Sequence, residues 1–140
     1  MASRALVFDF GTRKIGVAAA NRLTGTATAL TTLAARDGVP EWHDLATLIR
    51  DWQPEVLVVG LPRNADGSDS DMTARARGFQ RWLGERAGLP IEEIDERYNS
   101  AEAEDVLRDQ RRSGARTRRV RPADIDVMAA RLMAETWARS

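Results

Sequence analysis

The first third of the chain consists of short apolar runs separated by turn residues. Each run has the length of a strand, and the intervening turns contain Gly11 and Gly25; the runs cover residues 5–10, 15–20 and 26–33. In the third run threonine alternates with alanine and leucine, which is the period of two expected of a half-exposed strand. Because turns this short join neighbouring strands as hairpins, the pattern predicts three antiparallel strands.

The period of the apolar positions changes after residues 37–40, Asp-Gly-Val-Pro, which interrupt the strand pattern. Large apolar residues then recur every three or four positions, which predicts a helix over residues 42–52 that Pro54 ends. The next run, residues 55–60, is apolar after its first residue and has the length of one strand. An uninterrupted run of this kind is typical of a central strand buried on both faces.

Helices and strands alternate through the rest of the chain. A loop at residues 61–70 leads to a helix at 71–86, a strand at 91–96, a helix at 99–112 that begins with a capping box, and a helix from Ala123 or Asp124 to Trp137. Strands separated by helices pair in parallel. The prediction is therefore an α/β fold in a single domain spanning residues 1–140. Its mixed sheet has three antiparallel strands followed by parallel additions, with helices on both faces.

Composition narrows the classes of protein that this chain can represent. The 140 residues suit one compact domain, and 21 Lys plus Arg balance 21 Asp plus Glu. The absence of cysteine excludes thiol chemistry, Cys-ligated zinc and a disulfide scaffold. No apolar run reaches the roughly 18 to 20 residues that cross a membrane, and no signal-peptide pattern precedes the first strand. We therefore expect a cytoplasmic protein with no membrane partner.

Two carboxylates stand at the carboxyl ends of predicted strands. Asp9 ends an apolar strand, where a carboxylate loses hydration unless a cation or hydrogen-bond donors compensate. The alternative role for Asp9 is a turn aspartate that accepts hydrogen bonds from the amides of Gly11 or Thr12. Glu96 ends a later strand, where a surface ion pair is the alternative role. Both acids are candidates for a functional site at the strand ends.

A third carboxylate breaks the pattern of the last predicted helix. At about 100° per residue, Asp126 falls between Met133 and Trp137 in the apolar sector. Asp124 falls instead on the polar face, where the helix dipole favours an acid in the first turn. Residues that break the binary pattern are where functional sites are expected. We therefore favour Asp126 over Asp124 as the functional acid.

If Asp9, Glu96 and Asp126 converge on one cleft, their mutual repulsion requires a cation. Ligands made only of oxygen favour Mg²⁺ or Mn²⁺ over zinc. Two such ions can position a water on one side of a phosphodiester and stabilise the leaving oxygen on the other, without a protein nucleophile. A Ser/His/Asp site has no support, because the sequence has one histidine, His43, and no nucleophile elbow. The three acids are thus the predicted catalytic and metal-binding residues.

The balanced net charge conceals a strongly basic segment. Residues 108–121 contain seven arginines and one acid, a local charge of +6, and they lead into the last predicted helix. Such a segment can follow a polyanionic backbone, although a solvated loop is the alternative for any single arginine. Cations also adjoin two of the predicted metal ligands. The predicted phosphate-binding residues are Arg13, Lys14, Arg97, Arg116, Arg118 and Arg119.

Four motifs resemble those of the YqgF (RuvX) family, a branch of the RNase H-like superfamily. They are FDFGTRKIGVA at 8–18, VVGLPRNADG at 58–67, DER at 95–97 and IDVMAA at 125–130, which together extend over nearly the whole chain. The resemblance implies an RNase H-like fold and a metal-dependent nuclease site, whose acidic positions fall on Asp9, Glu96 and Asp126. It also implies a role in maturing the 5′ end of pre-16S ribosomal RNA during ribosome biogenesis. Older descriptions of the family call its members Holliday junction resolvases.

Three alternatives stay open on the sequence alone. A sugar-kinase or actin-like ATPase has the same Asp-x-Gly-Thr motif after its first strand, but it clamps its nucleotide between two domains. A junction resolvase would act on branched DNA as a two-fold dimer. A non-catalytic module would bind nucleic acid through the arginine-rich segment while the acids have structural roles. The favoured partner is pre-rRNA, with ribosomal precursor particles as a further candidate.

Overall fold

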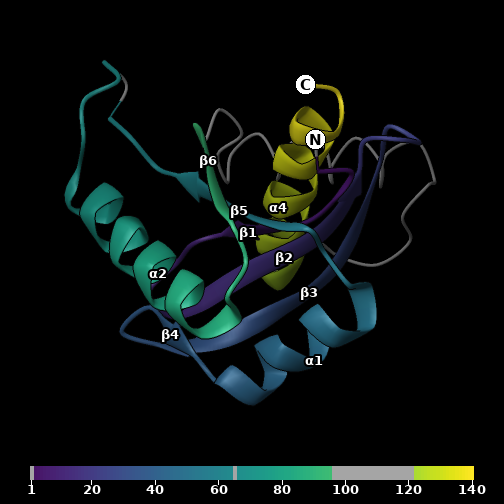
Figure 1. Ribbon diagram of the computed structural model, residues 1–140. Coiled ribbons are helices and arrows are strands. Elements are labelled where there is room, and N and C mark those ends of the chain that lie inside the picture. Colours follow the sequence, from purple (N-terminus) through teal and green to yellow (C-terminus); the bar gives the residue numbers. More distant parts are fainter. Residues whose placement is uncertain (1, 65, 96–121) are drawn as a thin grey trace.

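The computed structural model describes residues 2–64, 66–95 and 122–140, and for residues 122–126 it describes the backbone alone (Figure 1). In chain order the elements are β1 (Arg4–Asp9), β2 (Lys14–Asn21), β3 (Thr26–Arg36), β4 (Val39–Pro40), α1 (Trp42–Trp52), β5 (Val56–Leu61), α2 (Asp71–Ala87), β6 (Ile91–Asp95) and α4 (Pro122–Ala138). The helix predicted at 99–112 lies outside the described residues. In the described part of the chain, no helix is both long and apolar enough to cross a membrane.

The described strands form one six-stranded mixed sheet in the order β4-β3-β2-β1-β5-β6. The strands β1 to β4 pair antiparallel with one another in sequence order, whereas β5 pairs in parallel with both β1 and β6. This arrangement confirms the predicted antiparallel start and the parallel additions. The carboxyl ends of β1, β5 and β6 therefore meet at one end of the sheet.

The short strand β4 is a difference from the prediction, which treats residues 37–40 as a break. Asp37 and Gly38 have φ of 51° and 81°, and Arg36 pairs with Val39 across them. Two central residues with positive φ make a type I′ turn, for which Asp-Gly is a favoured pair. A strand of two residues is too short to show a period, so the apolar pattern does not reveal it. β3 accordingly runs beyond its predicted end into this hairpin.

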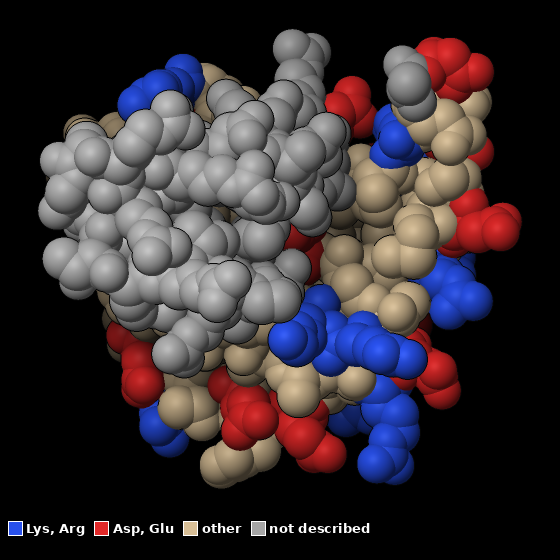
Figure 2. Space-filling view, turned by 180° about the vertical axis from the view of Figure 1, so that it is seen from behind, with Lys and Arg blue, Asp and Glu red and all other residues tan. Residues whose placement is uncertain are grey.

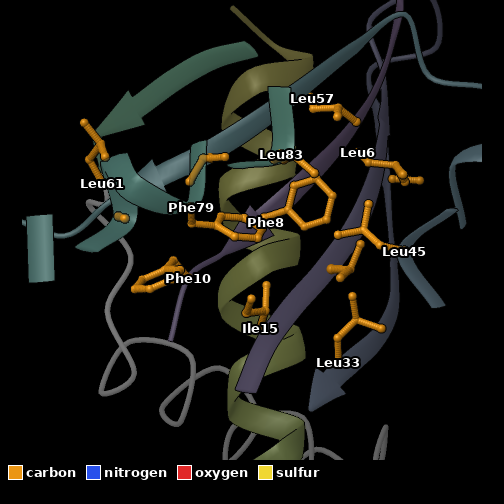
Figure 3. Close-up of a cluster of buried hydrophobic side chains, with 14 residues drawn as sticks. Leu6, Phe8, Phe10, Ile15, Leu33, Leu45, Leu57, Leu61, Phe79 and Leu83 are labelled. Carbon is orange, nitrogen blue, oxygen red and sulfur yellow. The ribbon is translucent and has the colours of Figure 1, made fainter. Parts of the chain in front are cut away.

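Helices α1 and α2 cover one face of the sheet with large apolar side chains. Leu6 and Phe8 of β1 point into this cluster and are fully buried (Figure 3). The ring of Phe79 in α2 lies 5.8 Å from the ring of Phe8 in an edge-to-face arrangement, which aromatic pairs favour. Complete burial of one such side chain is worth about 1.5–3 kcal/mol. This apolar layer holds α1 and α2 on the sheet.

Helix α4 covers the opposite face with smaller side chains (Figure 1). Ala5 and Val7 of β1 and Ala18 of β2 pack in one cluster with Ala130 and Ala134 of α4. Because alanine is small, the helix can lie close to the strands. The two layers together confirm the prediction of helices on both faces.

The direction of α4 is set by contacts at its C-terminal end. Arg22, which follows β2, donates from Nε to the carbonyl of Trp137 and from Nη1 to the carbonyl of Ala2, each at 3.3 Å. Its guanidinium also lies 3.8 Å from the centre of the Trp137 ring. The C-terminal end of α4 thus lies beside the segment that leads into β1. Helix α4 therefore runs in the opposite direction to β1, and its first turns lie toward the end of β1 at Asp9.

The close packing of α4 predicts a stability effect at Gly60. A Cβ atom at this position would lie 2.3 Å from Sδ of Met133, whose side chain is buried. Because the added atom has no space, we expect Gly60→Ala to lower the free energy of unfolding by about 1–3 kcal/mol. Chemical denaturation of the purified protein measures the change.

Gly78→Ala is the matched control for this substitution. Gly78 lies in α2, and a Cβ there would meet nothing within 4 Å beyond its own helix backbone. Alanine should raise the free energy of unfolding by about 0.5–1 kcal/mol, because it favours the helical conformation more than glycine does. Equal stability of the two variants would contradict the packing account.

Candidate active site

Asp9 is the last residue of β1 and lies on the face of the sheet that α4 covers. Side chains alternate between the two faces along a strand, and Ala5 and Val7 pack in the α4 cluster. The Asp9 side chain comes next on that face and is half-buried. Asp9 is therefore an acid in line with buried apolar residues, as its place in the sequence predicts.

Glycine flanks Asp9 on both neighbouring strands. Asp9 pairs with Gly16 of β2 and with Gly60 of β5. Residues paired across strands direct their side chains to the same face, so neither neighbour places a side chain beside the carboxylate. Packing also requires glycine at position 60, because the side chain of Met133 occupies the space that a Cβ atom would fill. The two paired glycines therefore contribute no side chain of their own to the row of Asp9.

The strand β6 continues the row of Asp9 across the sheet. Ile94 pairs with Gly60 and packs against the α4 cluster. Among the described residues β6 ends at Asp95, where the prediction places one further residue. Glu96, the predicted second ligand, lies outside the described residues. The predicted strand is thus confirmed as far as Asp95.

The backbone of Asp126 lies in the first turns of α4. Met133 and Trp137, which flank Asp126 in the predicted apolar sector, are buried in the α4 cluster. Arg131 and Glu135, assigned to the polar face, form an ion pair with an N–O distance of 3.3 Å. The predicted apolar and polar faces are therefore confirmed for these four residues. The side chain of Asp126 is outside the described part of the structure.

A divalent metal ion fits the donor chemistry of this position. Asp9 offers carboxylate oxygens beside two glycines, and oxygen donors suit Mg²⁺ or Mn²⁺. Within the side chains that the structure describes, no three His, Asp or Glu residues gather into a metal site. Of the three predicted ligands, the structure places the side chain of Asp9.

The turn that follows Asp9 contains two exposed cations, Arg13 and Lys14. The backbone carbonyls of Thr12 and Arg13 accept hydrogen bonds from the amides of Gly38 at 2.9 Å and Ala35 at 2.7 Å. The β3–β4 hairpin thereby anchors the turn and holds both cations close to the end of β1. The other predicted phosphate-binding residues lie outside the described residues: Arg97, Arg116, Arg118 and Arg119.

Charges of both signs lie on the face of the molecule that Figure 2 shows. Figure 2 shows acidic and basic side chains near one another where the described residues border the grey region. Phosphoryl chemistry needs groups that bind cations close to groups that bind phosphate. The surface charge is therefore compatible with the predicted chemistry despite a formal net charge of zero.

The loop between β5 and α2 is a hydrogen-bonded hairpin rather than the plain loop that the sequence predicts. Arg63 donates from Nη1 to Oδ1 of Asp69 at 2.9 Å, and its Nε lies 3.0 Å from Oδ1 of Asp95. The amide of Asn64 donates to the carbonyl of Ser68 at 2.9 Å. The Arg63–Asp69 and Asn64–Ser68 contacts close the loop, and the Arg63–Asp95 contact ties it to the end of β6. The sequence pattern did not identify Arg63 as part of this end of the sheet.

Two pKa shifts accompany the hairpin. The Ser68 hydroxyl and amide both donate to the Asp66 carboxylate, and they lower the pKa of Asp66. The hydrogen bond from Arg77 of α2 to Asp69 raises the pKa of the Arg77 guanidinium. Both shifts favour the charged forms of Asp66 and Arg77. The sequence signal that could have predicted the turn is Asp66 followed by Gly67, whose φ is 86°.

A family model described as "RuvX: Holliday junction resolvase" matches residues 3–140. The chain belongs to the RuvX family. Relatives named "Putative pre-16S rRNA nuclease" include a protein of Chromohalobacter salexigens that is 48% identical over 132 residues, covering 94% of this chain and 86% of the relative. The relative from Marinobacter nauticus is 43% identical over 136 residues, which cover 97% of this chain and 92% of the relative. The relative from Yersinia enterocolitica is 44% identical over 138 residues, which cover 98% of this chain and 96% of the relative.

Solved structures show the same fold at low sequence identity. RuvC from Thermus thermophilus in complex with a Holliday junction substrate superposes with a TM-score of 0.54 at 17% identity, covering 98% of this chain and 95% of RuvC. The yeast mitochondrial Holliday junction resolvase superposes with a TM-score of 0.55 at 15% identity, covering 98% and 78% of the two chains. Both similarities confirm the predicted RNase H-like fold of the RuvX chain.

Family membership gives the class of reaction. The RuvX chain is a nuclease, an enzyme that hydrolyses phosphodiester bonds in nucleic acid. Membership also implies dependence on a divalent metal ion. The predictions of an enzyme and of a nucleic-acid substrate are confirmed. The ATPase and the non-catalytic module are therefore set aside.

Removal of the Arg63 guanidinium should loosen the hairpin more than it destabilises the fold. The ion pairs with Asp69 and Asp95 are partly exposed, and each is worth at most about 1 kcal/mol. We expect Arg63→Ala to lower the free energy of unfolding by less than about 2 kcal/mol. Amide exchange at Asn64 should become faster, because its acceptor Ser68 is held less firmly. Hydrogen exchange followed by NMR measures this change.

Arg50→Ala is the control for the hairpin. Arg50 and the adjacent Asp51 form an ion pair between exposed side chains of α1. Removal of the Arg50 guanidinium should leave exchange at Asn64 unchanged. Faster exchange at Asn64 in both variants would show that the effect is not specific to the Arg63 contacts.

Proposed function

We propose that this RuvX protein hydrolyses phosphodiesters at the 5′ end of pre-16S ribosomal RNA, using divalent cations held by Asp9, Glu96 and Asp126. The observation that carries the proposal is the Asp9 carboxylate, which ends a buried strand between Gly16 and Gly60. The RNA substrate is the one in the names of relatives that are 43–48% identical to this chain.

Two further observations support a shared site for the three acids. Ile94 lies on the α4 face in the row of Asp9, and side chains return to the same face every second residue, which favours Glu96 on that side. Helix α4 runs against β1, so the turns that contain Asp126 lie toward the end of β1. Acids brought together repel one another, and cations relieve that repulsion. We propose two ions, Mg²⁺ or Mn²⁺, bound through oxygen.

The residues divide the work of hydrolysis between them. The three carboxylates hold and orient the cations. Divalent cations held there would make the attacking water more acidic and would offset the negative charge that grows on the phosphate. Arg13, Lys14 and Arg97 hold substrate phosphates beside the carboxylates, so the scissile bond is oriented before it reacts.

The arginine-rich segment at 108–121 supports a long substrate. We propose that Arg116, Arg118 and Arg119 bind phosphates of the RNA away from the scissile bond, where they add affinity without sequence preference. The proposed context is pre-rRNA in ribosomal precursor particles of the cytoplasm.

Cleavage of branched DNA is the second candidate function. The description of the family favours it, as does the fold shared with RuvC in complex with a Holliday junction substrate. Resolution of a junction requires two symmetric cuts and therefore a two-fold dimer. Light scattering gives the oligomeric state, and parallel assays compare a pre-16S rRNA fragment with a synthetic four-way junction. A dimer that cuts the junction and leaves the rRNA fragment intact would overturn the RNA proposal.

Neutralisation of any one of the three acids should abolish cleavage. Asp9→Asn, Glu96→Gln and Asp126→Asn keep the size of the side chain but remove the charge that holds a cation. We expect each rate to fall by at least about 100-fold, the scale of losing one group that stabilises the transition state. The initial rate of cleavage of a labelled RNA measures this effect, and RNA binding should persist. Removal of metal with EDTA should stop cleavage by the unaltered protein, and added Mg²⁺ or Mn²⁺ should restore it.

Asp124→Asn is the matched control for the acids. Asp124 stands two residues before Asp126, on the predicted polar face of the helix. This variant should cleave at close to the normal rate. Normal cleavage by Asp126→Asn, or a selective loss in Asp124→Asn, would refute the assignment of the third ligand.

Neutralisation of the arginine-rich segment should act on binding rather than on chemistry. We expect replacement of Arg116, Arg118 and Arg119 by glutamine to weaken RNA binding and to make its salt dependence shallower. The slope of log K against log salt should change by about 0.7 for each lost contact to single-stranded RNA. Binding measured across a salt series gives this slope. An unchanged slope would rule out phosphate contacts from these arginines.

A further inference from the structure

A concave surface lies between the β3–β4 hairpin and the helices α1 and α2, apart from the candidate active site. It has a volume of about 590 Å³. Its lining includes two tryptophans, two arginines and one acid: Trp42, Trp82, Arg36, Arg86 and Glu41. We call this surface the tryptophan groove. The proposed cleavage reaction uses none of these residues.

The two tryptophans form a rigid aromatic corner. The rings of Trp42 and Trp82 lie 6.0 Å apart and are inclined at 83°. Trp82 also stacks on Phe79 of the core at 6.0 Å, and the Arg86 guanidinium lies 5.2 Å from the centre of the Trp82 ring. Both tryptophans are only partly buried and line the groove. Rings held in this way offer a flat apolar surface that needs little ordering on binding.

The charges of the groove complement a phosphate. Arg36 and Arg86 are exposed and outnumber Glu41. A guanidinium binds phosphate oxygens and also stacks on planar rings. Aromatic surface beside cations is the combination with which proteins bind unpaired nucleotides. An acidic peptide would match the arginines but would make no use of the indole planes.

The groove lies at the same end of the sheet as Asp9, but on the face that α1 and α2 cover, so a strand of RNA that touches both must pass around this end of the sheet. Lys14 pairs with Ala34, and the carbonyl of Arg13 accepts a hydrogen bond from the amide of Ala35. Both alanines line the groove. Three strand spacings separate β1 from β4 in the sheet, which is about 14 Å at about 4.8 Å per spacing. Exposed cations therefore lead from the end of β1 to the groove.

We propose that the tryptophan groove binds an unpaired nucleotide of the RNA substrate, away from the scissile bond. The base stacks on the indole of Trp42 or Trp82, and the phosphate lies toward Arg36 and Arg86. This inference rests on the proposed function, because the RNA reaches the groove from the cleavage site at Asp9. It gives the nuclease a preference for substrates with a single-stranded segment beside the cleavage point.

Binding of a fluorescein-labelled 12-nucleotide oligouridine tests the groove. The Asp9→Asn background prevents cleavage during the measurement by fluorescence anisotropy. Trp42→Leu keeps an apolar side chain against the core but removes the stacking surface, and we expect it to raise Kd about tenfold. Arg86→Gln leaves both indoles in place and should raise Kd by a smaller factor, through the loss of one phosphate contact.

Trp52→Leu is the matched control. Trp52 ends α1, is 42% exposed and lines a different pocket, beside Arg4 and Thr28. Its replacement should leave Kd within about twofold of the background value. Thermal melting of each variant shows whether a loss of affinity accompanies a loss of folded protein.

Tryptophan fluorescence gives a second measurement with more conservative variants. We expect oligouridine to quench the emission of the Asp9→Asn protein, because a stacked base lies against an indole. The quenching should persist in Trp52→Phe and decrease in Trp42→Phe. This readout reports contact in the groove even where the change in affinity is small.

Equal binding by Trp42→Leu, Arg86→Gln and Trp52→Leu would overturn the inference and leave the groove to a protein partner. An equal loss of affinity for blunt duplex RNA would also overturn it, because paired bases are not free to stack. Both results are compatible with intact metal-dependent cleavage. Groove-dependent binding without any cleavage by the unaltered protein would instead count against the proposed function alone.

Discussion

The burial of β1 on both faces is the constraint on which the rest of the structure depends. Leu6 and Phe8 point into the cluster under α1 and α2, whereas Ala5 and Val7 pack under α4. Because successive side chains alternate, a shift of one residue along this strand would exchange the two sets. Leucine and phenylalanine would then meet the closely packed α4, so the register is strongly defined. Asp9 owes its place on the α4 face to that register.

Core packing and the proposed chemistry depend on the same row of residues. Gly60 admits the side chain of Met133 and, because it pairs with Asp9, adds no side chain beside the carboxylate. Gly16, which pairs with Asp9 on the other side, likewise adds no side chain to the row. The missing Cβ atom of Gly60 thus allows α4 to approach the sheet, and neither glycine adds a side chain of its own beside the carboxylate. A nuclease site placed here is built into the core rather than added on a loop.

A small hairpin connects the end of β1 with the rest of the surface. Strand β4 is too short to show an apolar period in the sequence. The amides of the β3–β4 hairpin nevertheless anchor the turn that holds Arg13 and Lys14. The same hairpin forms one wall of the tryptophan groove. Cations and aromatic rings are therefore arranged around one structural support. The formal net charge of zero hides this local separation of charge.

The apolar pattern of the sequence is enough to predict the longer helices and strands among the described residues, the mixed sheet and the anomaly at Asp9. Apolar periods report which face of an element is buried, and an acid that interrupts such a period is visible without a structure. The Arg63 hairpin and β4 were missed, because elements of a few residues have no period and their ion pairs join distant segments. The flanking of Asp9 by glycines and the groove formed by Trp42 and Trp82 are visible only in the folded structure. Strand pairing and helix packing bring these residues together, and neither is encoded in the spacing of nearby residues.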